Sequence, residues 1–127
     1  IDTNQYKPDS DLLLLDGIPR SVEQAKILHD HIDVLRVIHL VCPDSDALVM
    51  RMKKRADQQN RPDDADEEVI RRRIQVYEDE TRPVLDHYDN SKIVEIDAIG
   101  LPGDILQNIL NTIMPAAKGA IRNPFGN

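Results

Sequence analysis

An acid and an arginine directly follow the most apolar run of the sequence. The segment DLLLLDGIPR places Asp16 after four leucines, Leu12 to Leu15, and Arg20 after a turn that contains Gly17 and Pro19. A carboxylate can hold Mg²⁺ through water, and a guanidinium group can bind a phosphate through two hydrogen bonds. The alternative is that Asp16 caps a turn and Arg20 is an ordinary surface charge. The segment is therefore a candidate site for a phosphorylated ligand with its metal ion.

A second candidate is a group of arginines in residues 51–73. Arg51 and Arg55 are four residues apart, so both can reach one ligand from the same face of a helix. Arg61 follows a polar loop, and Arg71 to Arg73 enter the next helical segment. The acidic residues at 63–68 also allow a solvated surface of ion pairs. In a chain with a net charge of -7, however, arginines spread over two helices and a loop suit a triphosphate.

The helical period separates two neighbouring arginines of this group. Arg73 lies three residues after Ile70 and four before Tyr77, which places it at the edge of an apolar stripe at about 100° per residue. Arg72 points nearly opposite, toward solvent. An arginine beside a core stripe needs a partner, so the face argument favours Arg73 for a ligand role.

Three apolar runs predict strands, and four periodic segments between or after them predict helices. The strands are Leu12–Leu15, expected to be fully buried, Val34–Val41 and Ile93–Ile96; the helices run from N-cap Ser21 to about Asp30, from Asp44 or Ser45 through Gln59, from about Ala65 to Tyr88 and from Asp104 to Ile113. Strands that alternate with helices imply a parallel sheet in a three-layer α/β sandwich. In such sheets ligands bind outside the carboxyl ends of the strands, where Asp16 and Arg20 are expected. Residues 114–127 are expected to form a flexible tail.

Composition limits the class of protein. The chain has 127 residues, of which 40% are hydrophobic and 31% charged, which is typical of one globular domain. Its negative charge argues against a nucleic-acid partner, and no apolar run approaches the roughly 20 residues that span a bilayer, so no membrane partner is expected. The single Cys42 excludes a disulfide within the chain, and a start unlike a signal peptide predicts a cytoplasmic location.

Three segments together resemble adenylate kinases, which are nucleoside monophosphate kinases. LLLLDGIPRSVEQA is similar to their D-G-x-P-R-x-x-x-Q segment, and RMKKRADQQNRPDDADEEVIRRRIQVYEDETRPVLDHY to their R-x-x-x-R, R-x-D-D and long-helix segments. IVEIDAIGLPGDI resembles their last strand and the loop beside adenine. The resemblance covers roughly residues 6–113, in the same order. It implies the nucleoside monophosphate kinase form of the P-loop fold and reversible phosphoryl transfer from Mg·ATP to AMP.

The resemblance also implies a role for each matching side chain on the AMP side. Asp16 would hold a water bound to Mg²⁺, Arg20 would bind the AMP phosphate, and Gln24 would hydrogen-bond the adenine of AMP. Arg61 and Arg73 would bind AMP as well and would act in the transfer.

On the ATP side, Arg51 would lie over the adenine, and Arg55 would hold the phosphoryl groups in transit. Residues 56–65 would form a short lid. The spacing after the paired aspartates is one residue longer than is usual in the family, so by family match alone either Arg72 or Arg73 is the helix arginine. Long-lid members often carry a four-ligand zinc site, which one cysteine cannot build, so no zinc is expected.

One motif of this class is absent from residues 1–127. Phosphoryl transfer depends on a G-x-x-x-x-G-K-[ST] loop, and none of the five glycines heads such a pattern. In the family this loop precedes D-G-x-P-R. We therefore expect residues 1–113 to be the C-terminal portion of an adenylate kinase core, truncated, cleaved or natural, inactive alone, and associated with a missing N-terminal segment or a second copy. The alternative is a non-catalytic nucleotide-binding or interaction module of the same fold. ATP and GTP both remain open as the donor.

Overall fold

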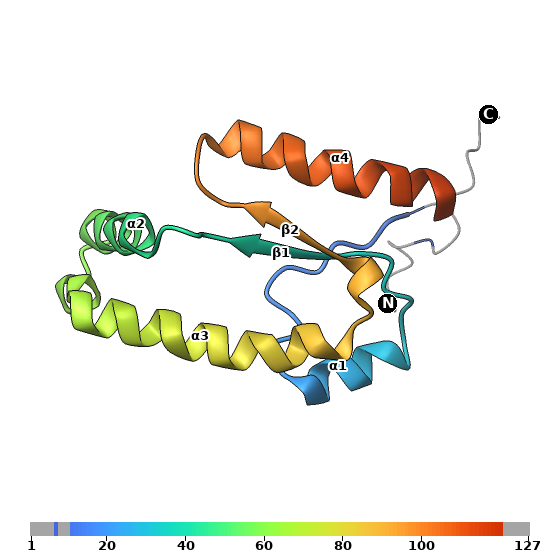
Figure 1. The fold of residues 1–127 in the computed structure, drawn as a ribbon, viewed down its shortest axis with the longest axis horizontal. Helices are drawn as coiled ribbons and strands as arrows, with labels where there is room; N and C mark the ends of the chain where they lie inside the picture. Colours follow the sequence, from blue (N-terminus) through green and yellow to red (C-terminus); the bar gives the residue numbers. More distant parts are fainter. Residues whose placement is uncertain (1–6, 8–10, 121–127) are drawn as a thin grey trace.

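The computed structural model describes residue 7 and residues 11–120 (Figure 1). The elements in chain order are α1 (Val22–His29), β1 (Val37–Val41), α2 (Ser45–Gln58), the 3₁₀ turn η1 (Pro62–Ala65), α3 (Glu67–His87), the 3₁₀ turn η2 (Asn90–Lys92), β2 (Ile93–Asp97) and α4 (Pro102–Ala120). The alternation of strands and helices predicted from the sequence is therefore present from α1 onward.

The two strands form a parallel pair, as predicted. Val37 lies opposite Ile93, and Val41 lies opposite Asp97, so both strands end at the same edge. Figure 1 shows α4 on one side of the strands and α3 with α1 on the other. Helix α4 packs on β2, α1 packs on α3, and α2 packs on η1 and α3. The α/β class with a parallel sheet is thus confirmed, here with two strands.

Side-chain caps explain where three helices begin. The hydroxyl of Ser21 accepts a hydrogen bond from the Gln24 backbone at 3.2 Å, as the predicted N-cap should. Asp44 accepts in the same way from the Ala47 backbone at 3.0 Å, and Asp66 accepts from the Glu68 backbone at 2.9 Å. These short polar side chains satisfy N–H groups that a helix leaves free in its first turn. They fix α1, α2 and α3 close to their predicted starts.

The hydrophobic core of the described residues is small. Ile70, on α3, is the one large side chain that is fully buried, and Val84 of the same helix and Ile96 of β2 are nearly so. The remaining buried apolar residues are Ala25, Val49, Ala56 and Ala117. The predicted stripe on α3 therefore does face inward at Ile70 and Val84, but it covers little apolar area.

The prediction that Leu12–Leu15 is a buried strand is wrong for this structure. The segment has no strand assignment, and the exposed fractions of Leu13, Leu14 and Leu15 are 42%, 70% and 38%. A strand needs a hydrogen-bonded neighbour, and the sheet of the described residues consists of β1 and β2 alone. The leucine run therefore remains unpaired.

Two predicted boundaries also need correction. The strand expected from Val34 begins at Val37, because residues 32–36 precede the pairing with β2. The last helix does not stop at Ile113 but continues to Ala120 and includes Pro115, so the first seven residues of the expected flexible tail are helical. The rest of that tail, 121–127, lies outside the described residues.

Candidate functional site

A pocket lies where the two parallel strands end. Its volume is about 260 Å³, and its walls are formed by Cys42, Ala47, Arg51, Ile99, Gly100 and Pro102. They come from the end of β1, from the first turns of α2, and from the loop that joins β2 to α4. The pocket thus occupies the place that parallel α/β sheets use for ligands.

Arg51 is held at this pocket by a contact across the fold. Its Nη1 donates a hydrogen bond of 2.7 Å to the carbonyl of Ala98, in the loop after β2. The loop is shaped by Asp97, whose carboxylate accepts from the Ile99 backbone at 2.8 Å, and by Gly100 at φ 120°. The positive φ favours glycine there. A planar cation beside apolar side chains and backbone groups suits a flat, uncharged ring such as a nucleobase.

The Asp16–Arg20 turn is tied together by local hydrogen bonds. Arg20 Nε donates to the Gly17 carbonyl at 2.8 Å, and the Arg20 backbone N–H donates to Gln24 Oε1 at 2.7 Å. Gly17 has φ 78°, which the turn requires. Arg20 is therefore oriented through Nε, while its two terminal nitrogens remain available to an anion.

Asp16 is exposed, and its carboxylate has no hydrogen bond or ion pair with the described residues. An exposed carboxylate four residues before an oriented arginine is suited to a hydrated divalent cation. The sequence predicted that both residues follow a buried strand, whereas in the structure they follow an exposed segment without a strand partner among the described residues.

Arg55 and Arg61 lie near the turn between α2 and η1. Both are exposed, and neither side chain has a hydrogen bond or ion pair within the described part of the chain. The turn is closed by Asn60 at φ 51° and by a 2.9 Å bond from the Arg61 backbone to the Ala56 carbonyl. The two guanidinium groups are thus free to bind an anion.

The three consecutive arginines of α3 have three different surroundings. Arg73 makes an ion pair of 2.9 Å with Asp64 of η1, within the segment expected to form the lid. Arg72 is exposed and unpaired among the described residues. Arg71 bridges two carboxylates, at 2.6 Å to Asp46 and 3.0 Å to Glu67. The helical period predicted that Arg73 has a partner and that Arg72 points to solvent, and the structure shows this difference. The ligand role of Arg73 stays a prediction.

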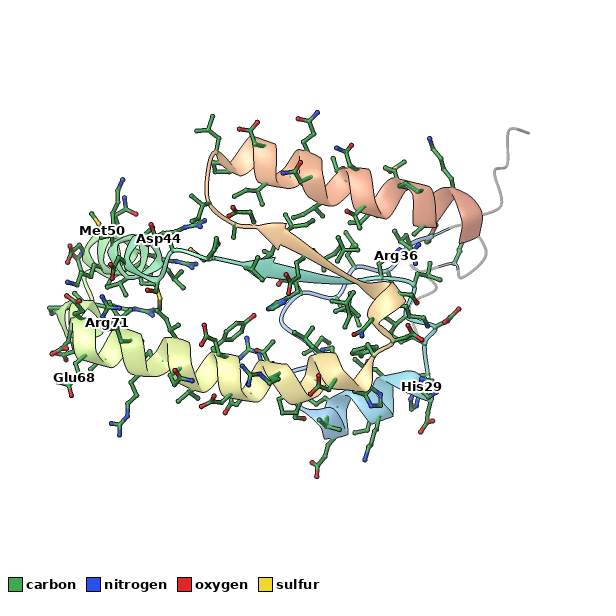
Figure 2. All side chains as sticks on the ribbon, in the orientation of Figure 1. His29, Arg36, Asp44, Met50, Glu68 and Arg71 are labelled. Atoms are coloured by element: carbon green, nitrogen blue, oxygen red, sulfur yellow. The ribbon has the colours of Figure 1, made fainter. Side chains whose placement is uncertain are left out.

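The sequence reasoning missed the role of Arg71. Figure 2 shows this side chain at the end of the molecule where α2 and the start of α3 lie close together. Lys53 of α2 joins the same cluster through a 2.9 Å pair with Glu67. Hydrogen bonds from Lys53 and Arg71 lower the pKa of Glu67, and the bond with Asp46 raises the pKa of Arg71. The i, i+4 spacing of Glu67 and Arg71 could have predicted their ion pair from the sequence. The contact of Arg71 with Asp46 could not be predicted in this way, because the two residues are 25 positions apart.

The candidate residues therefore form two groups. Arg51, Arg55, Arg61 and Arg73 come from the hairpin α2–η1–α3, whose members pack on one another. Asp16, Arg20 and Gln24 come from the turn before α1 and from its first turns, and no hydrogen bond or ion pair joins the two groups. Gln24 of the second group and Arg73 of the first lie on α1 and α3, which pack on each other.

A larger pocket, of about 330 Å³, lies at the opposite ends of the strands. It is lined by residues 29–34 together with Tyr88 and Lys92, all of which precede β1 or β2. His29, labelled in Figure 2, meets His87 edge to face with ring centres 6.4 Å apart. Partial burial raises the pKa of Tyr88. None of the candidate arginines lines this pocket.

Two further features were sought in the described part of the chain. Residues 7 and 11–120 contain no group of three or more histidine, cysteine, aspartate or glutamate side chains placed to hold a metal ion. None of the helices described is both long and apolar enough to cross a bilayer.

The class of protein follows from fold and sequence together. A parallel α/β chain with an arginine-rich helical hairpin at its strand ends is compatible with part of a nucleoside monophosphate kinase. The chain is 38% identical to the adenylate kinase of Mycobacterium ulcerans, in a match that covers 89% of this chain and 62% of the relative. It is 48% identical to that of Rhodococcus erythropolis, over 68% of this chain and 47% of the relative. No protein-family model matches.

The particular family is adenylate kinase: the chain belongs to it and corresponds to a C-terminal portion of its members. A third relative, from Kocuria rhizophila, is 38% identical over 76% of this chain and 54% of its own length. The chain thus spans about half to three fifths of the curated relatives it matches.

Proposed function

We propose that this chain supplies the arginine clamp and the adenine-side pocket of an adenylate kinase. The whole protein would transfer a phosphoryl group reversibly between Mg·ATP and AMP and form two molecules of ADP. The observation that carries the proposal is Arg51, bonded to the Ala98 carbonyl beside a pocket at the strand ends. Family membership supports the same reaction. The complete fold would be a three-layer sandwich, and the single cysteine suits a cytoplasmic location.

In this proposal the chain contributes positioning and charge, and no covalent intermediate is needed. Arg51 packs on the adenine of ATP, and Arg20 binds the AMP phosphate with the terminal nitrogens that its bond to Gly17 leaves free. Arg55 and Arg61 are unpaired among the described residues and are available to the transferring phosphoryl group. Fixed cations around a phosphoryl group in transit stabilise the charge on its oxygens and align the reactants.

The lid motion would change the partner of one arginine. Arg73 is paired with Asp64 of η1. In the proposed closed state the phosphate replaces that carboxylate, so the pair holds Arg73 near its working position until substrate arrives. Residues 56–65 would close over ATP and exclude water.

Magnesium fits the same arrangement. Asp16 is exposed and unpaired among the described residues, and it lies one turn before Arg20, so it can accept from a water bound to the ion. When bound with ATP, Mg²⁺ neutralises charge on the phosphate oxygens.

One alternative has an observation in its favour. Residues 1–127 contain no G-x-x-x-x-G-K-[ST] loop, so this chain alone has the arginines without the phosphate cradle. A non-catalytic nucleotide-binding module would have the same pocket and no turnover.

A chimera tests the proposal. The portion of the Mycobacterium marinum adenylate kinase that precedes its match to this chain is fused to residues 1–127, and ADP formation is measured with ATP and each of AMP, UMP and CMP. We expect turnover with preference for AMP, because the amide of Gln24 can pair with adenine. A chimera that unfolds cooperatively and binds ATP but forms no ADP would favour the non-catalytic module.

A further inference from the structure

An ion-pair cluster joins the two helices that carry most of the candidate arginines. It consists of Asp46 and Lys53 on α2 and of Glu67 and Arg71 on α3, with ion pairs of 2.6, 2.9 and 3.0 Å. Arg71 bonds to both helices, since its Nη2 donates to Asp46 while its Nε and Nη2 donate to Glu67. Figure 1 views α2 almost along its axis while α3 lies across the picture, so the cluster ties together two helices that cross steeply.

On α2 the cluster lies opposite the candidate arginines. Asp46 and Lys53 are seven residues apart, so at about 100° per residue they share one side of the helix to within about 20°. Arg51 and Arg55 each lie two residues from Lys53, which places both about 160° around the helix from it. Side chains at this spacing do not face each other. The cluster therefore does not share a ligand with these arginines, but it can fix the side that α2 presents to that ligand.

The same spacing occurs on α3. Arg73 lies two residues after Arg71, again about 160° around the helix. It bonds to Asp64 of η1 and not to the cluster. On both helices, a candidate arginine is thus placed two positions from a residue that joins α2 to α3.

The buried residues of the two helices lie between the cluster and the candidate arginines. By the helical period these are Val49 and Ala56 on α2 and Ile70 on α3. Such small side chains interlock few ridges and grooves, so packing alone specifies the rotation of these helices about their axes weakly. Charge-assisted hydrogen bonds are directional, and a row of them along one flank adds the missing specification.

We propose that the ion-pair cluster is a positioning device for phosphoryl transfer, with Arg71 as its central positioning residue. It holds α2 and α3 in the rotation that presents Arg51, Arg55 and Arg73 to one nucleotide. Arg71 is suited to this role because its planar guanidinium group bonds two carboxylates in one fixed geometry. The inference rests on the proposed function for its effect on turnover, whereas the orientation of α2 is measurable without turnover.

The hydrogen bond from Arg51 to the Ala98 carbonyl, 2.7 Å long, reports the orientation of α2. The ¹³C chemical shift of that carbonyl is measured by NMR in residues 1–127, and Arg51→Ala supplies the value without the bond. In Arg71→Gln we expect the shift to move toward the Arg51→Ala value. An unchanged shift would overturn the proposal, because α2 would then keep its rotation without Arg71.

Arg82→Gln is the matched control for this measurement. Arg82 lies eleven residues beyond Arg71, on the same side of α3 to within about 20° but about 16 Å further along the helix. It is exposed and has no ion pair with the described residues. Its replacement should leave the Ala98 shift in place. Circular dichroism checks that both variants keep their helices, and equal changes of the shift in both would overturn the proposal.

Turnover is tested in the chimera with the Mycobacterium marinum portion. Arg71→Gln should lower kcat/KM for ADP formation about twofold to fivefold, the range of an exposed charge pair, and Arg82→Gln should not. Asp46→Asn should lower kcat/KM as well, and the double variant should lose no more than Arg71→Gln alone, because Asp46 acts through Arg71.

The sign of the Asp46→Asn effect distinguishes positioning from direct attraction. If Arg71 attracted the nucleotide by its charge alone, removal of the neighbouring carboxylate would raise kcat/KM. A rise in Asp46→Asn, or losses that multiply in the double variant, would overturn the positioning role. A chimera that forms no ADP contradicts the proposed function instead, and the Ala98 shift then decides whether the cluster orients α2.

Discussion

At the scale of single residues, Arg20 is the clearest candidate for a substrate contact. In the chimera, Arg20→Ala should cost on the order of 2–4 kcal/mol of transition-state stabilisation, as loss of one preorganised charged donor does. Thermal stability should hold, because Arg20 is exposed and its hydrogen bonds stay within its own turn and the first turns of α1. The measurement is kcat/KM for ADP formation.

Arg36→Ala is the matched control for that change. Arg36 is also exposed and also bonds a neighbouring carbonyl, that of Leu35 at 2.7 Å, but it directly precedes β1, at the end opposite the carboxyl ends of the strands (Figure 2). It should leave kcat/KM nearly unchanged. Near-normal turnover of Arg20→Ala, or an equal loss in both variants, would remove Arg20 from the proposed site.

Two adjacent arginines of α3 offer a second comparison at this scale. Arg73→Ala should lower kcat/KM of the chimera far more than Arg72→Ala, because Arg73 already reaches η1 through Asp64 while Arg72 extends into solvent. Both residues are exposed, so neither change should lower stability by more than about 0.5 kcal/mol. The reverse order of kcat/KM would show that the longer spacing of RPDDADEEVIRRR brings Arg72 to the phosphates.

At the scale of elements, the cluster of Asp46, Lys53, Glu67 and Arg71 joins α2 to α3. The pKa of Glu67 lies below 4.5 in the folded chain, chiefly through hydrogen bonds with Lys53 and Arg71. A depressed carboxyl pKa adds stability that is present above about pH 4.5 and is lost as pH falls through the folded value. We therefore expect unfolding by urea to depend less on pH below 4.5 in Glu67→Gln than in the unchanged chain.

Glu68→Gln is the control, because Glu68 neighbours Glu67 on α3 but has no ion pair in the described structure (Figure 2). Its acid dependence should match that of the unchanged chain. If the two variants behave alike between pH 3 and 5, a window set by the 4.5 reference value, the cluster does not hold the two helices together.

The helices and strands also differ in how well they could be predicted from the sequence. The helices were readable because their signals are local: Ser21, Asp44 and Asp66 cap helices through neighbours two or three residues away. Leu12–Leu15 had the composition of a buried strand, but a strand exists only beside another, and the described residues provide none. The link from Arg71 to Asp46 was equally hidden, because it depends on how two helices pack. The turn from Asp16 to Arg20 was predictable because the hydrogen bonds of Arg20 reach only Gly17 and Gln24, whereas its role in ligand binding stays a prediction.

At the scale of the whole molecule, the open surfaces determine how residues 1–127 should behave alone. Among the described residues one large side chain is fully buried. Leu14 is 70% exposed in a segment without a strand partner, and Leu40 is 46% exposed on β1, which has β2 as its one partner among the described residues. Such surfaces favour pairing with another chain over a stable free state. We expect light scattering of the purified chain to give a mass above 14.4 kDa that rises with concentration.

The same sample should form no ADP from ATP and AMP in a coupled assay. The proposed phosphate contacts of Arg20, Arg55 and Arg61 are present, but the loop that would cradle the phosphates is absent from residues 1–127. Adding the N-terminal portion of the Mycobacterium marinum enzyme should lower the measured mass to that of a one-to-one complex and restore ADP formation together. The mass and the rate of ADP formation distinguish two causes of failure. A one-to-one complex without ADP formation would contradict the roles proposed for the arginines. ADP formation by the chain alone would contradict the requirement for the phosphate-binding loop. A compact monomer of 14.4 kDa with adenylate kinase activity would contradict both expectations and would mean that other groups of this chain hold the phosphates.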